Sequence, residues 1–263
     1  MSRVDVALVQ RGLALTRGRA QELVLSGRVF VRSRENRRVV SKVSARVSAD
    51  DDLEVISAEG EEDFVSRGGR KMRGALDHLK LKVNGFYVLD IGISTGGFTD
   101  CLLRAGVSRV VGVDVGHGQL ASRLRRDDRV HLLEGVNARG LSNPRYLNRI
   151  FELNERRKFD LIVIDVSFIS LTLVLPELIQ YLKRPTGTAV AVLALVKPQF
   201  EVGRAGLGKN GVVKDSALYG TVEEKIRRCC GSNQLIVEDY FASSIEGTEG
   251  NREFFVYATP SKV

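Results

Sequence analysis

Residues 89–98 decide the fold: Leu89-Asp90-Ile91-Gly92-Ile93-Ser94-Thr95-Gly96-Gly97-Phe98. The apolar residues up to Ile91 are typical of a buried strand, and three glycines follow. Glycines here allow a tight turn and let the backbone approach a ligand closely, and a helix expected at residues 98–105 offers free N–H groups. The stretch therefore predicts a strand–loop–helix unit with a ligand at its loop, although any tight turn can use glycine.

Strand-like and helix-like runs alternate through the rest of the chain from Ser66, which opens a first helical stretch. Strands are expected at residues 86–91, 110–113, 130–133, 161–164, 189–196, 235–242 and 253–258, and further helices at 171–182 and 216–230, with Pro176 a candidate kink. This alternation predicts parallel β-α units and an α/β fold with a doubly wound sheet. Ligands of such sheets bind beyond the carboxyl ends of the strands, so the residues that end strands are the candidate functional residues.

The second expected strand ends in Asp114, whose carboxylate can accept hydrogen bonds from both ribose hydroxyls of an adenosine group. The glycine spacing is not Gly-x-Gly-x-x-Gly, which disfavours a dinucleotide. Asp90, just before the turn, suits the ammonium group of an amino acid better than a pyrophosphate. These features together predict S-adenosylmethionine as the cofactor. Its predicted contacts are Asp90, Gly92, Ser94, Thr95, Gly96, Gly97, Asp114 and Asp165.

Two neighbouring strands also end in charged residues: 161–164 is followed by Asp165, and 189–196 by Lys197. Either residue alone is an ordinary solvated strand end, but the two together beside a cofactor site favour a reaction centre. Lys71 lies before the first strand in a basic run, where an exposed helix face is the simpler interpretation. Nothing physical in the sequence singles out Glu253, at the start of the last strand.

Residues 1–57 predict a separate, small α+β module, joined by a linker at 58–65 to a larger domain at 66–263. Two short helices are expected, the second capped by Thr16, and then strands at 29–31, 43–47 and 53–56. The first 49 residues hold eleven basic side chains against three acidic ones, whereas the other 214 hold 29 of each sign. Because the excess charge is confined to one module, that module is expected to bind a polyanion.

Several classes of protein are excluded by composition. Three cysteines and three scattered histidines form no disulfide framework and no zinc motif, so we expect no metal site. Of the adjacent Cys229 and Cys230, at least one is expected to pack in the core. The chain shows no signal peptide and no apolar run long enough to span a membrane, which indicates a cytoplasmic protein.

Five motifs in order resemble the TlyA family: residues 66–71 (Ser-Arg-Gly-Gly-Arg-Lys), 90–98, 114–120, 165–171 (Asp-Val-Ser-Phe-Ile-Ser-Leu) and 195–201 (Leu-Val-Lys-Pro-Gln-Phe-Glu). Members of that family are rRNA ribose 2′-O-methyltransferases, historically labelled hemolysins, with a catalytic domain similar to FtsJ. The basic module resembles the small RNA-binding domain named after ribosomal protein S-four. His117 departs from the family pattern, where tyrosine is common, and so does Arg70, where His or an apolar residue is expected.

The resemblance implies a Lys-Asp-Lys-Glu tetrad at Lys71, Asp165, Lys197 and Glu253. Lys197 is then the general base for the ribose hydroxyl, the two carboxylates orient the lysines, and Lys71 holds the hydroxyl or its phosphate. The implied partner is ribosomal RNA, with cytidine as the target, within ribosomal subunits; which subunit, and the oligomeric state, stay open. The predicted RNA contacts are Arg3, Arg11, Arg17, Arg19, Arg28, Arg67 and Arg70.

Three other functions are compatible with parts of the sequence. Residues 165–168, Asp-Val-Ser-Phe, also resemble the Asp-Pro-Pro-Tyr motif of base N-methyltransferases, but both prolines are missing. A pore-forming hemolysin needs a membrane-spanning segment, and the sequence shows none. A bare RNA-binding scaffold leaves the glycine loop unexplained. The loop at residues 203–211, with four glycines and two cations, is either a flexible surface loop or a lid over RNA.

Overall fold

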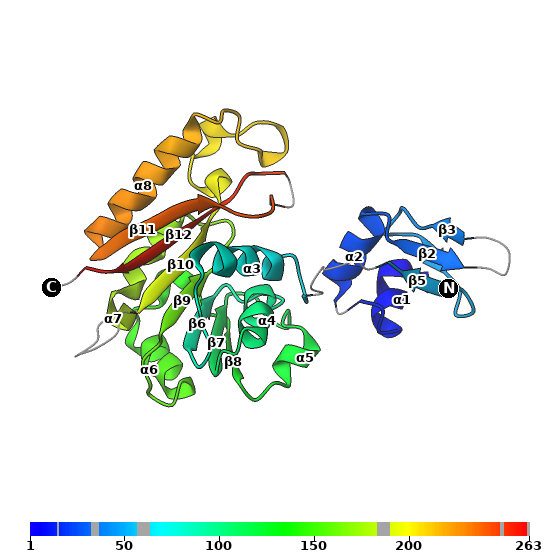
Figure 1. The fold of residues 1–263 in the computed structure, drawn as a ribbon, viewed down its shortest axis with the longest axis horizontal. Coiled ribbons are helices and arrows are strands. Elements are labelled where there is room, and N and C mark those ends of the chain that lie inside the picture. The colour runs from blue at the N-terminus through cyan, green and yellow to red at the C-terminus, as the bar shows by residue number, and fades with distance from the viewer. Residues whose placement is uncertain (15, 33–36, 57–63, 183–189, 248–249, 262–263) are drawn as a thin grey trace. The chain divides into compact units, whose positions relative to one another are not determined.

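The computed structural model describes residues 1–14, 16–32, 37–56, 64–182, 190–247 and 250–261, and it divides into two compact units, Met1–Gly69 and Arg70–Val263 (Figure 1). Residues 58–63 of the expected linker lie outside the described residues. The remaining two, Phe64 and Val65, are buried. The division by compactness therefore falls within helix α3 (Gly68–Leu79), a few residues after the boundary expected from composition.

The first unit has two helices, α1 (Val4–Gln10) and α2 (Arg17–Leu25). Thr16 caps α2 as predicted, since its side chain accepts a hydrogen bond from the backbone N–H of Arg19 at 3.2 Å. Beside them lies a three-stranded antiparallel sheet of order β3-β2-β5, and a two-stranded pair joins β1 to β4. The strands are β1 (Ser2–Arg3), β2 (Val29–Arg32), β3 (Arg37–Val39), β4 (Arg46–Val47) and β5 (Asp52–Val55).

Three strands of this unit differ from expectation, and one of them, β1, is a two-residue strand that was not predicted. The strand expected at 43–47 is reduced to Arg46–Val47, because residues 43 and 44 form a turn. Strand β3 was not predicted, and its sequence Arg-Arg-Val is exposed throughout. An edge strand with no buried face has no alternation of apolar residues, so the pattern that predicts strands is absent from it.

The second unit is built on a seven-stranded sheet of order β11-β12-β10-β9-β6-β7-β8, which confirms the α/β doubly wound class. The strands are β6 (Tyr87–Ile91), β7 (Arg109–Asp114), β8 (Val130–Glu134), β9 (Leu161–Ile164), β10 (Ala191–Val196), β11 (Leu235–Ala242) and β12 (Phe254–Pro260). The expectation of parallel pairing is wrong for β12, which pairs antiparallel with both β10 and β11. The segment between β11 and β12 is too short for a crossover helix, so β12 must run back beside β11.

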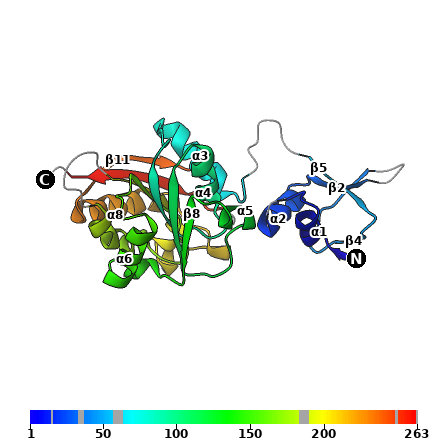
Figure 2. The ribbon, with the colours of Figure 1, turned by 90° about the horizontal axis from the view of Figure 1, so that it is seen from below.

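Helices cover both faces of this sheet (Figure 2). In that view α3 and α4 (Gly97–Arg104) lie on one face, and α6 (Pro144–Leu153) and α8 (Leu218–Ser232) lie on the other. The second face buries the apolar residues of α6 and α8 against alternate residues of the strands, such as Ile162 and Ile164. Cys230 packs in this core, as expected of one of the two adjacent cysteines, and burial raises the pKa of its thiol to about 12.

Several helical segments differ from the sequence-based expectation, among them α5 (Ser122–Arg125), which was not predicted. Helix α6 was not predicted, although Asn143 caps it and Pro144 stands at its first turn. The helix expected at 171–182 is three short pieces: 3-10 turns at Leu171–Leu173 and Leu175–Leu178, then α7 (Ile179–Leu182). Pro176 lacks the N–H that a continuous α-helix needs, which accounts for the break.

None of the helices in the described ranges is long and apolar enough to cross a membrane. Within the same ranges, no group of three or more His, Cys, Asp or Glu side chains is arranged to hold a metal ion.

Candidate active site

Four of the predicted site residues lie where β9 and β10 end and β12 begins: Lys71, Asp165, Lys197 and Glu253. Parallel pairing of Ala194 with Ile164 brings the end of β9 beside β10. Antiparallel pairing of Val196 with Phe254 then brings the start of β12 to the same side of the sheet. Asp165, Lys197 and Glu253 are the next residues at these three strand ends, and we call the place where they meet the carboxyl edge. An acid that begins a strand reaches this edge only because β12 is antiparallel.

The four charged side chains form two ion pairs at the carboxyl edge. The ammonium of Lys197 lies 2.7 Å from Oδ1 of Asp165 and donates a hydrogen bond to Oγ of Ser167 at 2.8 Å. The ammonium of Lys71, from α3, donates to Oε2 of Glu253 at 2.5 Å. Ser167 was not predicted as a site residue, although it lies within the motif at 165–171.

The two pairs differ in their access to solvent. The side chains of Lys71 and Glu253 are 10% and 3% exposed, so that pair is almost wholly desolvated. Lys197 and Asp165 are 12% and 23% exposed. A buried charge is costly unless a counter-charge accompanies it, so each carboxylate keeps its lysine in place. The Lys197–Asp165 pair is the one that an approaching substrate can reach.

A cavity of about 500 Å³ opens at the ends of β6, β7, β8 and β9. Its lining includes four of the residues predicted to hold the cofactor: Gly92, Ser94, Asp114 and Asp165. The lining does not include Asp90, or Thr95, Gly96 and Gly97 at the turn into α4, where Gly96 is the N-cap with φ 94°. The volume is in the range of pockets that enclose small ligands.

The cavity also has walls that were not predicted: Val115, Gln119, Asn137, Arg139 and Phe168. Asn137 and Arg139 follow β8, the third strand along the chain from the glycine loop. Because ligands bind beyond the carboxyl ends of all the central strands, the end of this strand was a signal for them.

Two features fix the floor of the cavity. A Cβ at Gly92, where φ is 87°, would lie 2.4 Å from the carbonyl oxygen of Asp165, so only glycine allows β6 and β9 to end this close together. The carboxylate of Asp114 accepts hydrogen bonds from the N–H groups of Ser94 at 2.8 Å and Gly116 at 2.7 Å. Each oxygen keeps a free lone pair, so the oriented carboxylate can still accept ligand hydroxyls.

Asp90 is the most perturbed acid near the cavity. It is fully buried, and Oδ2 accepts a hydrogen bond from the hydroxyl of Thr99 at 2.6 Å. Oδ1 has no hydrogen-bond partner among the residues that the structure describes. Burial, with the nearby charges of Asp165 and Asp114, raises the pKa of Asp90 to about 7 despite the bond from Thr99. An orphaned, buried carboxylate oxygen fits a cationic ligand group, and its charge would be stabilised by one.

The loop at residues 203–214 is folded against the segment that precedes Glu253. Leu207 and Val213 form a β-bridge, and the side chain of the buried Asn251 accepts from the N–H of Val213 and donates to the carbonyl of Gly211, both at 3.1 Å. Asn251 therefore holds the glycine-rich loop against the segment that leads to Glu253 at the carboxyl edge.

The arginines predicted to bind RNA have varied surroundings. Arg11 donates to the carbonyls of Ser48 and Ala49 at 2.6 and 3.1 Å and also to that of Asp51, so it holds the loop before β5. Arg19 is buried and pairs with Glu22 at 3.1 Å.

Arg3 and Arg17 are exposed and share the fully buried carboxylate of Asp5. Burial acts to raise the pKa of Asp5, but hydrogen bonds from Arg3, Gln21 and Arg17 lower it well below its usual range. The other three predicted contacts, Arg28, Arg67 and Arg70, are half-buried.

Comparison with known proteins identifies the family. The FtsJ-like methyltransferase profile matches residues 64–259. The chain is 41% identical to the 16S/23S rRNA (cytidine-2′-O)-methyltransferase TlyA of Mycobacterium tuberculosis, over 97% of this chain and 89% of that protein.

The chain belongs to the TlyA family. It is also 33% identical to hemolysin A of Brachyspira hyodysenteriae, over 97% of this chain and 98% of that protein. A solved structure of a Streptococcus thermophilus protein named as a hemolysin has a TM-score of 0.72 and 35% identity, over 99% of this chain and 89% of that one. This TlyA-family chain is therefore a methyltransferase with an FtsJ-like catalytic domain, as the resemblance in its motifs implied.

Proposed function

We propose that this enzyme transfers a methyl group from S-adenosylmethionine to the ribose 2′-hydroxyl of cytidine in ribosomal RNA. The observation that carries the proposal is the partly exposed Lys197–Asp165 pair beside the 500 Å³ cavity. A lysine amine and a carboxylate beside the cavity support a reaction between a substrate hydroxyl and a cofactor bound there. The name of the M. tuberculosis relative supplies the reaction and the substrate class.

The residues around the cavity fit S-adenosylmethionine. Asp90, with its orphaned oxygen, suits the ammonium group, and Asp114 keeps lone pairs for the ribose hydroxyls. The backbone at Gly92 allows close approach, and Asn137 and Val115 belong to the same wall as Asp114 and suit the adenine. When bound, the cofactor supplies a methyl group on a positively charged sulfur, which is already a strong electrophile.

The protein's own task is then to activate and orient the hydroxyl. Lys197, once it has released its own proton to solvent, would accept the proton of the 2′-hydroxyl, which turns the ribose oxygen into a nucleophile for the methyl group that the cofactor would supply. Asp165 and Ser167 hold the amine in place and stabilise the ammonium that forms. Lys71, oriented by Glu253, binds the reacting oxygen or the adjacent phosphate. Most of the acceleration comes from holding these groups in line.

RNA binding is assigned chiefly to the first unit. Positions 1–49 hold eleven basic residues against three acidic ones, and this excess of positive charge suits a polyanion. The exposed Arg3 and Arg17 and the half-buried Arg28 are the better candidates among the predicted contacts. Arg67, just before α3, and Arg70, in the first turns of α3, remain candidates as well. Arg11 and Arg19 act first as structural residues of the unit.

A base N-methyltransferase is not favoured. Its motif holds a planar nitrogen between prolines and an aromatic residue, whereas this chain has Val166 and Ser167 at the proline positions and turns Ser167 toward Lys197. A lysine that can accept a proton at that place suits a hydroxyl, which must lose a proton to react, better than an amino group.

The test is to incubate the protein and labelled S-adenosylmethionine with each unmethylated ribosomal subunit and to map the product by nuclease digestion and mass spectrometry. We expect the label on the ribose of cytidine in one subunit or both. Label on a base, or none on either subunit, would contradict the proposal.

A further inference from the structure

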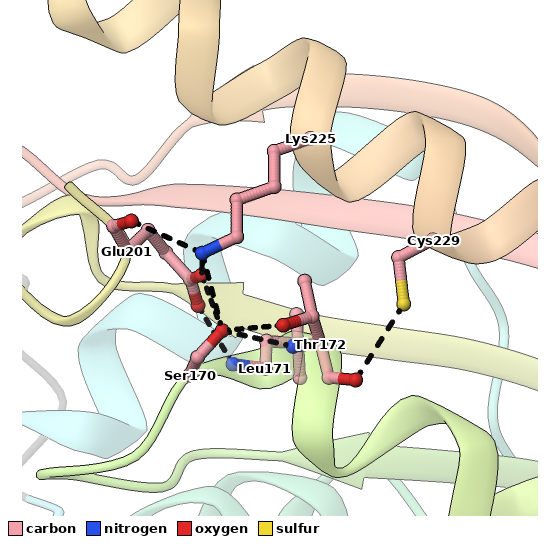
Figure 3. A network of polar contacts seen from close by, with 6 residues as sticks. All are labelled: Ser170, Leu171, Thr172, Glu201, Lys225 and Cys229. Carbon is pink, nitrogen blue, oxygen red and sulfur yellow. Dashed lines mark hydrogen bonds and ion pairs between the residues drawn. The ribbon is translucent and has the colours of Figure 1, made fainter. Parts of the chain in front are cut away.

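A buried carboxylate, that of Glu201, lies behind the two loops that hold Asp165 and Lys197. Only the short turn Pro198–Phe200 separates Lys197 from Glu201 along the chain. The side chain of Glu201 is 1% exposed and faces the polar network drawn in Figure 3. This residue does not line the cavity and takes no part in the reaction described above.

Glu201 joins the loop after β10 to the loop after β9. The hydroxyl of Ser170 donates to Oε2 of Glu201 at 2.6 Å, and the N–H of Leu171 donates to Oε1 at 2.7 Å (Figure 3). Both donors lie a few residues after Asp165. The two loops are therefore bound at the reactive end by Lys197 with Asp165 and behind it by Glu201 with Ser170 and Leu171, and the rings of Phe168 and Phe200 also pack, with centroids 5.3 Å apart.

Helix α8 supplies the counter-charge for this carboxylate. The ammonium of Lys225 donates to Oε2 of Glu201 at 2.8 Å and to its backbone carbonyl at 3.0 Å. One turn later, Sγ of Cys229 lies 3.7 Å from the carbonyl oxygen of Thr172. A desolvated carboxylate requires such a partner, so α8 contacts both loops and holds the carboxylate between them.

The loop after β9 needs two anchors because its backbone is strained. Phe168 has φ 63°, a left-handed conformation that side chains rarely adopt, and it is 92% exposed. Strain of this kind persists only where the surrounding structure fixes the segment on both sides. Ser167, bonded to Lys197, and Ser170, bonded to Glu201, flank the strained residue.

We propose that Glu201, with Lys225, is a positioning residue that sets where the amine of Lys197 lies relative to Asp165. The inference rests on the proposed function, in which that amine takes the hydroxyl proton. Loosening the rear anchor lets the two loops separate by a fraction of an ångström. Such a displacement lowers the rate of the chemical step, whereas the cofactor cavity and the RNA-binding arginines keep their contacts.

The test is Glu201→Gln, with Glu223→Gln as its matched control. Glutamine keeps the shape but has one acceptor oxygen in place of two and no charge, so at least one of the three donors, Ser170, Leu171 and Lys225, loses its partner. Glu223 is also in an ion pair, with Arg227, but on the exposed side of α8. At a temperature well below each melting point, we expect kcat of Glu201→Gln to fall by about tenfold or more, with the RNA KM and cofactor Kd within about twofold. A lowered melting point with unchanged kcat would show a purely structural role and overturn the proposal.

A second variant and a second measurement cover the other outcomes. Ser170→Ala removes only one hydroxyl, so it keeps the test available if Glu201→Gln does not fold, and a lower kcat is again expected. Hydrogen exchange of residues 165–171 needs no activity: exchange should be faster in Glu201→Gln than in Glu223→Gln, and equal exchange would contradict the proposal. A wild-type protein that transfers no methyl group to ribose would instead contradict the proposed function.

Discussion

The first unit and the carboxyl edge both depend on cationic side chains, but they hold them in different ways. In the first unit the basic residues outnumber the acidic ones, and many of the basic residues, such as Arg32 and Arg38, are exposed. At the carboxyl edge each lysine has its own carboxylate and is largely buried. An exposed excess of charge attracts a polyanion and is screened by salt, whereas a desolvated pair is fixed in geometry and insensitive to salt. The same residue types thus support affinity in one region and chemistry in the other.

The largest expected effect separates chemistry from binding at the carboxyl edge. Lys197→Ala should lower kcat by roughly 10³-fold, because it removes the proposed general base. The cofactor Kd should stay within about twofold, since the contacts proposed for Asp90 and Asp114 remain. Single-turnover methylation and calorimetry measure the two quantities, and Lys214→Ala, at an exposed lysine, is the control. Near-normal turnover would remove Lys197 from its role.

The second prediction concerns the buried pair. Glu253→Gln leaves the ammonium of Lys71 without its counter-charge, which should destabilise the fold by about 3 kcal/mol. Activity should fall by about 10- to 100-fold, since the lysine loses its orientation. Denaturant unfolding and methylation rates measure these effects, with Glu238→Gln, an exposed acid on β11, as control. The double variant Lys71→Met with Glu253→Gln should recover stability but not activity; recovery of both would make this pair a packing feature only.

The third prediction tests the charge of the first unit. Arg32→Ala with Arg38→Ala should weaken RNA binding by about tenfold and reduce the slope of log affinity against log salt by about two, one for each lost phosphate contact. The rate at saturating RNA should not change. Filter binding over a salt series measures the slope, and Arg227→Ala, on α8, is the control. An unchanged slope would mean that neither of these two arginines, which lie on opposite faces of the small sheet, contacts RNA.

The smallest effect is a pH dependence that arises from Asp90. Its pKa of about 7 leaves the carboxyl mostly neutral at pH 6 and mostly ionised at pH 8. Because a ligand ammonium favours the ionised form, cofactor affinity should rise by about threefold per pH unit across this range, with release of a proton. Calorimetry in buffers of different ionisation enthalpy measures both.

The control for this effect is Asp90→Asn, which should bind weakly at every pH. The raised pKa also means that the cofactor-free protein loses stability as the pH rises from about 4 through 7, because burial penalises the ionised carboxyl. A cofactor affinity that did not vary between pH 6 and 8 would remove Asp90 from the ammonium site.

Most of the sheet was predictable because its strands are short apolar runs bounded by charge or glycine. The strand at 161–164 and the strand at 235–242 were located to the residue. Helix α6 was missed although Tyr146, Leu147, Ile150 and Phe151 are spaced as on one helix face and pack on the core. In the helix expected at 171–182, Pro176 was a correct candidate for a break, but the 3-10 form of the pieces was not predicted.

Within the site, the sequence by itself determined the residues that follow parallel strands. Asp90, Asp114, Asp165 and Lys197 are local signals, since a strand end in a doubly wound sheet points to the ligand whatever the rest of the chain does. Only the tertiary structure gives a physical reason for Glu253 to belong to the site. An acid at the start of a strand reaches the carboxyl edge only when that strand is antiparallel. The tertiary structure alone also brought Glu201 to Ser170 and Lys225. Contacts between loops depend on strand order and register, which no local pattern of residues encodes.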